Sequence, residues 1–95
     1  MNIKKAAEEH SEWVNKQDWQ KTTVLEKLAL IGSEVGEAVN ECRGNTPTEE
    51  FQHEIADIVL RVFHLAETEN IDIEKAIEKK MERNKKKDID KSKLK

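Results

Sequence analysis

The chain has 95 residues, of which 39% are charged and 36% hydrophobic, and its formal net charge is −3. This length suits a single domain, and so short a chain buries only about 60–65% of the surface that its unfolded form exposes. We therefore expect a homo-oligomer, either a dimer or a tetramer, because a second chain would enlarge the thin core. The negative net charge argues against a nucleic-acid binder.

Cysteine usage and hydropathy bear on the compartment. Cys42 is the single cysteine, so an internal disulfide is excluded. The sequence shows neither a secretory signal nor a transmembrane segment. We therefore expect a cytoplasmic protein without a membrane partner.

Charge is distributed unevenly along the chain. Between residues 28 and 60 a single base, Arg43, stands among seven acids, which are Glu34, Glu37, Glu41, Glu49, Glu50, Glu54 and Asp57. Between residues 79 and 95, nine bases outnumber three acids. An acidic middle and a basic end suit a site that holds a cation and, against it, an anion. We interpret residues 1–87 as the folded domain and residues 88–95 as a basic, flexible tail.

Hydrophobic spacing predicts four helices, and the composition is rich in residues that favour helices. The first predicted helix covers residues 3–17, with His10 and Val14 on its apolar stripe and Trp13 beside them in the core. The second covers residues 23–42.

Local signals mark where the later helices begin and end. Gly44 is a natural left-handed cap after the second helix. Thr46 caps the third helix, Pro47 takes its first position, and Glu49 completes a capping box. Asp72 caps the fourth helix, which should fray near residue 87. Because the connections are short, we expect an all-α fold: an antiparallel four-helix-bundle-like protomer that is completed by oligomerisation.

Two acid pairs in the middle of the chain are candidate metal ligands. Glu34 and Glu37 lie three residues apart on the second predicted helix, and Glu54 and Asp57 lie three apart on the third, so each pair shares a helix face. The residue numbers of Glu37 and Glu54 add up to the same total as those of Glu34 and Asp57. In an antiparallel hairpin with a regular rise, the four carboxylates therefore lie level and form one square patch.

Such a patch needs a cation. Apart from Arg61, no base lies one helical turn from any of the four acids. Carboxylates gathered at low dielectric must protonate or bind a cation, and all-oxygen ligation favours Mg²⁺, with Mn²⁺ or Ca²⁺ in its place. The alternatives are a solvated acidic ridge and a di-iron bundle. The di-iron bundle needs a second Glu-x-x-His step beside Glu50 and His53, which the chain lacks.

The two acid motifs and their surroundings, LALIGSEVGEAVNE and EIADIVLRV, resemble those of the MazG-type all-α nucleotide pyrophosphohydrolases. This family also contains dimeric dUTPases and dCTP pyrophosphatases, and the likeness spans residues 7–87. The resemblance implies that the four acids bind Mg²⁺. It also implies cleavage of nucleoside triphosphates, deoxy or not, to monophosphate and pyrophosphate, as in house-cleaning of the nucleotide pool.

The resemblance also implies roles for residues at the two ends of the chain. Lys80 and Asn84 match a lysine and an asparagine that touch the phosphates, although Lys80 could instead be a snorkelling side chain. His10 and Trp19 match the base-binding segment of the dCTP-pyrophosphatase branch, although His10 could instead be a core histidine. Glu37, with Glu34, is our candidate for positioning the attacking water.

Two departures from the family limit what can be carried over. Arg61 stands where some relatives have an aromatic residue, and it could pair with Asp57 or Glu54 or reach a phosphate. An aromatic that other relatives have after the second helix is absent, so the preferred base is not predicted. The alternative function is a non-catalytic helical oligomerisation or interaction module, whose stability would not depend on Mg²⁺.

Overall fold

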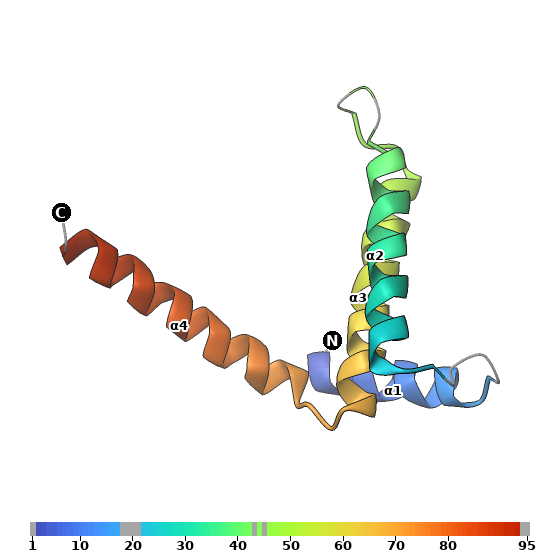
Figure 1. Cartoon of the computed structure of the whole chain (residues 1–95), viewed down its shortest axis with the longest axis horizontal. Coiled ribbons are helices and arrows are strands. Elements are labelled where there is room, and N and C mark those ends of the chain that lie inside the picture. The colour runs from blue at the N-terminus through green and yellow to red at the C-terminus, as the bar shows by residue number, and fades with distance from the viewer. Residues whose placement is uncertain (1, 18–21, 43, 45, 94–95) are drawn as a thin grey trace.

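Four helices account for nearly all of the chain that the structure describes (Figure 1). The computed structural model describes residues 2–17, 22–42, 44 and 46–93, and the side chains up to residue 87. The helices are α1 (Ile3–Asn15), α2 (Val24–Asn40), α3 (Glu50–Thr68) and α4 (Ile73–Lys93). Within these ranges there is no strand, so the predicted all-α fold is confirmed.

Helices α2 and α3 form an antiparallel pair, and α1 packs across α3 at the end of the pair away from the connecting turn (Figure 1). Helix α4 begins against α1, where the backbone N–H of Lys4 donates to Glu74 Oε1 at 3.4 Å. It then projects away from the α2–α3 pair. The antiparallel arrangement of the second and third helices is thus as predicted, whereas α4 does not run along them within one chain.

Helix starts are fixed by short side chains that accept backbone hydrogen bonds. Thr23 and Glu26 form a capping box at α2, with the amide of Glu26 donating to Thr23 Oγ1 at 3.1 Å. Asp72 caps α4 as predicted, because Oδ1 accepts from the amide of Lys75 at 3.1 Å. Gly44 has a φ of 81°, the left-handed conformation predicted for it.

Helices α1 and α2 end two residues before the predicted ends, and two other boundaries differ by three residues or more. Helix α3 begins at Glu50, and its N-cap residue Glu49 makes no side-chain capping bond. Thr48 is instead held by the end of α2: its amide donates to the carbonyl of Glu41 at 3.1 Å, and its hydroxyl donates to the Glu41 carboxylate. These bonds compete with a helical start at Pro47. Helix α4 continues to Lys93, past the predicted end near residue 87, because neither glycine nor proline interrupts it.

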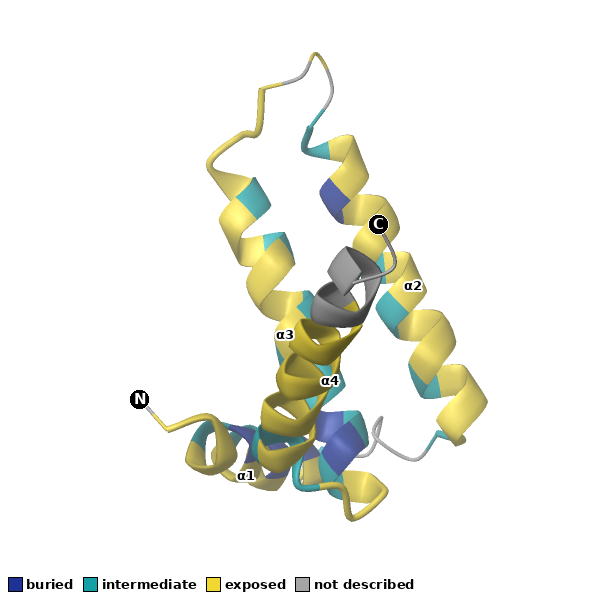
Figure 2. Cartoon of the chain, turned by 90° about the vertical axis from the view of Figure 1, so that its left-hand side faces the viewer, coloured by how far each residue is buried: buried dark blue, intermediate teal, exposed yellow. Residues whose placement is uncertain are grey.

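The core is thin and sits mostly where α1 crosses α3, with one buried residue, Ala38, on α2 near the turn to α3 (Figure 2). Its buried apolar side chains are small: Ala7, Val14, Ala38 and Ala66. Large apolar side chains on α2 stay exposed, with Leu25 at 77% and Val39 at 64%. No helix in the described part of the chain is both long and apolar enough to cross a membrane.

The cap of α4 yields a first prediction. Asp72→Ala should lower the free energy of unfolding by about 1 kcal/mol, because the amide of Lys75 loses its acceptor. Asp72→Asn keeps the acceptor and removes only the weak ion pair with Lys4, whose Nζ lies 4.0 Å from Asp72 Oδ2. This control should cost less than about 0.5 kcal/mol. Urea denaturation measures both, and equal losses would contradict the cap.

Candidate functional site

Helices α2 and α3 bring the predicted acids together. Glu34 from α2 and Glu54 and Asp57 from α3 each offer a carboxylate oxygen, and these three atoms lie within 4.8 Å of one another. Glu37 adjoins this acid cluster through Glu54, whose titration it influences by charge and by a side-chain hydrogen bond. The regular rise of two antiparallel helices therefore brings three of the four predicted acids together and leaves the fourth, Glu37, next to Glu54.

Partial burial makes it unfavourable for all of the carboxylates in the acid cluster to be charged at once. The side chain of Glu34 is 13% exposed. Oε2 of Glu34 and Oε2 of Glu54 are buried, and neither has a hydrogen-bond partner among the described residues. Burial raises the pKa of Glu54, and the neighbouring charges of Glu37, Glu34 and Asp57 raise it further. Buried acceptor oxygens without donors suit a hard divalent cation, so the donor set fits Mg²⁺ or Mn²⁺.

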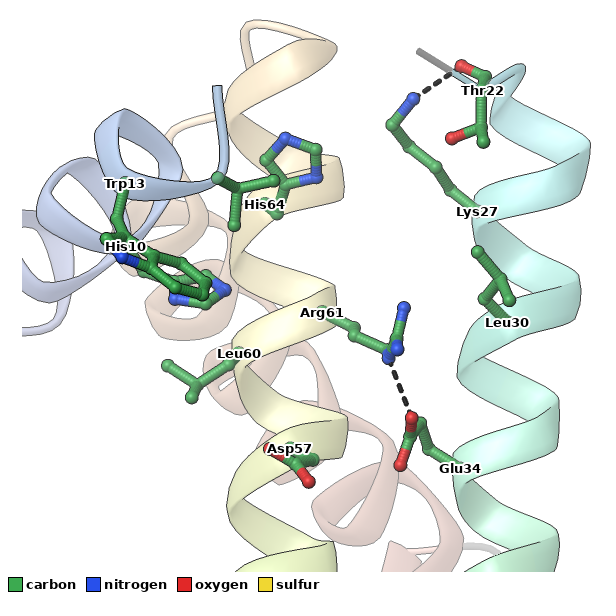
Figure 3. A pocket seen from close by; sticks show the side chains of 11 residues that line it. His10, Trp13, Thr22, Lys27, Leu30, Glu34, Asp57, Leu60, Arg61 and His64 are labelled. Carbon is green, nitrogen blue, oxygen red and sulfur yellow. Dashed lines mark hydrogen bonds and ion pairs between the residues drawn. The ribbon is translucent and has the colours of Figure 1, made fainter. Parts of the chain in front are cut away.

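Arg61 makes an ion pair with the acid cluster, but not with the partner that the sequence suggested. Its Nε donates to Glu34 Oε1 at 3.0 Å (Figure 3). The sequence left open a pair with Asp57 or Glu54 and contact with a phosphate, and the pair that the described residues form is with Glu34. Arg61 lies on the side of α3 that faces α2, so its long side chain meets an acid of the other helix.

A pocket of about 180 Å³ opens beside the acid cluster, between α1, α2 and α3 (Figure 3). It is lined by His10, Trp13, Val14, Thr22, Lys27, Leu30, Glu34, Asp57, Leu60, Arg61 and His64. In Figure 3 the acids lie at one end, Arg61 lies next to them and extends from α3 toward α2, and the rings of His10 and Trp13 lie on the α1 side of α3. The pocket thus offers a cation site and an aromatic surface within one cavity.

His10, a predicted base-binding residue, lines this pocket with Trp13. Their rings stack with centroids 6.0 Å apart and planes at 29°. Burial lowers the pKa of His10; the charge of Asp57 opposes this shift and that of Arg61 adds to it. Trp13 is 56% exposed, so its prediction as a core residue is wrong. The buried face of α1 is filled by smaller side chains, which leaves Trp13 at the rim. Trp19 lies outside the described residues.

Two basic side chains that line the pocket, Lys27 and His64, were not among the predicted site residues. Lys27 donates from Nζ to the carbonyl of Thr22, and His64 is buried with Nε2 3.3 Å from Asn15 Oδ1. Burial lowers the pKa of His64, and the charges of Lys27 and His10 lower it further. A signal was present: Lys27 precedes Glu34 by seven residues and His64 follows Asp57 by seven. Two helical turns keep each on the face of an acid.

Lys80 and Asn84 are not brought to the acid cluster within one chain. Both side chains are exposed on α4. This helix projects away from the α2–α3 pair that carries the acids. Any role for them at the pocket therefore requires an α4 from another copy.

Comparison of the sequence with models of known protein families shows which family the chain belongs to. The sequence profile of the MazG nucleotide pyrophosphohydrolase domain matches residues 20–90. The chain belongs to the MazG nucleotide pyrophosphohydrolase family. The matched range of this MazG chain contains the four acids and most of α4 but leaves out α1, which carries His10 and Trp13. Neither the curated proteins nor the solved structures gave a match.

The raised pKa of Glu54 yields a second prediction, which concerns the stability of this MazG protein in the absence of metal ions. A carboxyl whose folded-state pKa is raised favours folding most below its unfolded pKa, and this advantage is lost as pH rises through the folded-state pKa. Glu54→Gln removes the repulsion. It should therefore raise the melting temperature by a few degrees at about pH 8 and change it little at about pH 4.

Thermal melts followed by circular dichroism in EDTA measure this difference. Glu9→Gln, an exposed acid on α1, is the matched control and should behave like wild type at both pH values. A lower melting temperature for Glu54→Gln at about pH 8 would show that the Glu54 charge stabilises the metal-free fold.

Proposed function

We propose that this MazG protein is a Mg²⁺-dependent enzyme that hydrolyses ribo- or deoxyribonucleoside triphosphates to monophosphate and pyrophosphate, in house-cleaning of the nucleotide pool. Pyrophosphohydrolysis of nucleotides is the activity of the family to which the chain belongs. The observation that supports the metal-dependent reaction is the acid cluster, where two buried carboxylate oxygens lack hydrogen-bond donors beside an aromatic pocket. A helical interaction module has no use for such costly burial.

The acids provide the metal site and the water. Glu34, Glu37, Glu54 and Asp57 would hold Mg²⁺, with Mn²⁺ as a substitute, and the bound ion would neutralise charge on the phosphates. Glu37, with Glu34, accepts hydrogen bonds from a water and aims its oxygen at the α-phosphorus. The new P–O bond forms as the bond from the α-phosphorus to the oxygen shared with the β-phosphate breaks, the proton of the water passes to Glu37, and pyrophosphate leaves with the shared oxygen.

The pocket provides the binding of the nucleoside. The stacked rings of His10 and Trp13 offer a π-surface to a base, and an imidazole with a lowered pKa stays neutral and able to donate or accept a hydrogen bond. Trp19 remains part of this proposal. The base itself is not specified by these contacts.

A second copy of the chain would complete the site. The exposed apolar side chains of α2, such as Leu25 and Val39, would be covered in a homo-oligomer, either a dimer or a tetramer. Lys80 and Asn84 on the α4 of a second copy would then bind the departing pyrophosphate.

The third prediction tests the reaction. Incubating the protein with a panel of nucleoside triphosphates and Mg²⁺ should yield monophosphate and pyrophosphate, separated by ion-exchange chromatography. Glu37→Gln should lower kcat at least about 100-fold without loss of helicity, because a neutral amide cannot take a proton from the water and is a weaker ligand for Mg²⁺. The Glu9→Gln control should retain full activity. Recovery of diphosphate and orthophosphate would contradict the assignment.

The fourth prediction tests the assembly. Light scattering at micromolar concentration should give a mass of at least two chains, against 11.0 kDa for one. Leu25→Glu should shift the mass toward the monomer, because it places a charge on the exposed apolar face of α2.

Mixed chains test whether the second copy contributes Lys80. Refolding Glu37→Gln and Lys80→Ala chains together should restore part of the activity that each lacks, because some sites then combine intact acids with an intact lysine. Absence of any restoration, in mixtures shown to form mixed oligomers, would contradict a site shared between copies.

A further inference from the structure

Arg61 occupies two environments at once, because it pairs with the acid cluster and lines the pocket. Its Nε contacts Glu34 Oε1 at 3.0 Å, and its side chain is 36% exposed. Glu34 also belongs to the group of three acids whose oxygens lie within 4.8 Å. The same carboxylate is therefore a partner of a guanidinium and a candidate ligand of a divalent ion.

These two uses of Glu34 compete. In the absence of a metal, Arg61 offsets part of the repulsion among the carboxylates, and Oε2 of Glu34 is buried with no donor among the described residues. A divalent ion at the cluster would offset the same charge more strongly and would repel a guanidinium at this distance. Binding of the ion therefore weakens the hold of Glu34 on Arg61.

The place of Arg61 along α3 indicates what it meets when released. It follows Asp57 by one helical turn and precedes His64 by almost one turn. In Figure 3 Arg61 lies further along α3 than the acids and extends toward α2, whereas the ring pair of His10 and Trp13 lies on the α1 side of α3. In a nucleotide bound with its phosphates at the acids and its base at the rings, the group at this level is the α-phosphate.

We propose that Arg61 exchanges partners: it neutralises Glu34 in the metal-free protein and binds a non-bridging oxygen of the α-phosphate once a divalent ion is bound. This inference rests on the proposed function for its second half and on the ion pair alone for its first half. A planar guanidinium matches phosphate oxygens in a way that an ammonium does not. Arg61 is thus a substrate-binding residue that the metal makes available.

The first half is tested by Mg²⁺ binding without nucleotide. In isothermal titration calorimetry, Arg61→Gln should bind Mg²⁺ about tenfold more tightly than wild type, because a competing cation is gone. Arg61→Lys keeps a cation there and should stay within about twofold of wild type. Lys5→Gln removes the same charge from an exposed site on α1 and should leave Mg²⁺ affinity unchanged. Weaker binding of Mg²⁺ by Arg61→Gln, with helicity intact, would overturn the exchange.

The second half is tested by product binding in the presence of saturating Mg²⁺. The α-phosphate stays with the monophosphate, so Arg61→Gln should weaken binding of nucleoside monophosphates about tenfold or more and leave pyrophosphate binding within about twofold. The probes are the four common deoxynucleoside monophosphates and inorganic pyrophosphate. Arg61→Lys should weaken monophosphate binding by an intermediate factor, because lysine keeps the positive charge but cannot donate two parallel hydrogen bonds as the guanidinium does.

The outcomes separate this inference from the proposed reaction. Weaker binding of pyrophosphate, with monophosphate binding unchanged, would place Arg61 at the departing phosphates and overturn the α-phosphate contact. If no triphosphate is hydrolysed yet Arg61→Gln still binds Mg²⁺ more tightly, the proposed reaction fails and the exchange at Glu34 stands. A loss of both affinities, with a lower melting temperature, would reduce Arg61 to a structural residue and overturn both halves.

Discussion

Repulsion among carboxylates held level by two antiparallel helices is the constraint on which the rest of this structure depends. Helices α2 and α3 place Glu34, Glu54 and Asp57 together and Glu37 beside them, and part of this charge is buried. Like charges at such distances favour any process that removes or offsets one of them. Protonation of Glu54, the ion pair with Arg61 and binding of a divalent ion are three such processes. Because all three processes offset the same negative charges, each one makes the other two less favourable.

The groups that line the pocket favour one orientation of a bound nucleotide. Acids lie at one end, Arg61 follows them along α3, and the stacked rings of His10 and Trp13 lie on the α1 side of the pocket. A nucleotide with a metal on its phosphates has the same succession of groups: cation, phosphate anion, sugar and aromatic base. A ligand bound in the reverse sense would place its phosphates beside the rings and leave the acids without a counter-ion. The arrangement therefore favours one orientation, and that orientation is the one that puts the α-phosphorus near the candidate water-binding acids.

The sequence was informative where regular geometry decides the outcome and failed where side-chain reach or chain packing decides it. The rise of an α-helix is constant, so the level of Glu34 with Asp57 followed from counting residues on either side of the turn. The partner of Arg61 did not follow, because periodicity along one helix says nothing about a long side chain that crosses to another. The start of α3 was misplaced because Thr48 bonds to Glu41 in the preceding helix, a tertiary contact that a capping motif does not record. The exposure of Trp13 depends on which neighbours fill the narrow buried face of α1, which hydrophobic spacing alone leaves open.

The position of α4 links the electrostatics of the site to assembly. Within one chain the basic part of α4 projects away from the acidic α2–α3 pair, so opposite charges that could stabilise each other stay apart. The large apolar side chains of α2 are exposed at the same time, and the core that holds the chain together consists mainly of small residues. Packing against a second copy would bury the apolar face, and an α4 laid near the partner's acids would add a positive potential there. A positive α4 lowers the repulsion among the acids without occupying their oxygens, unlike Arg61, which uses one. Assembly of this kind would therefore leave Glu34 freer to bind a metal ion, and it would do so while bringing a lysine to the side of the site where pyrophosphate departs.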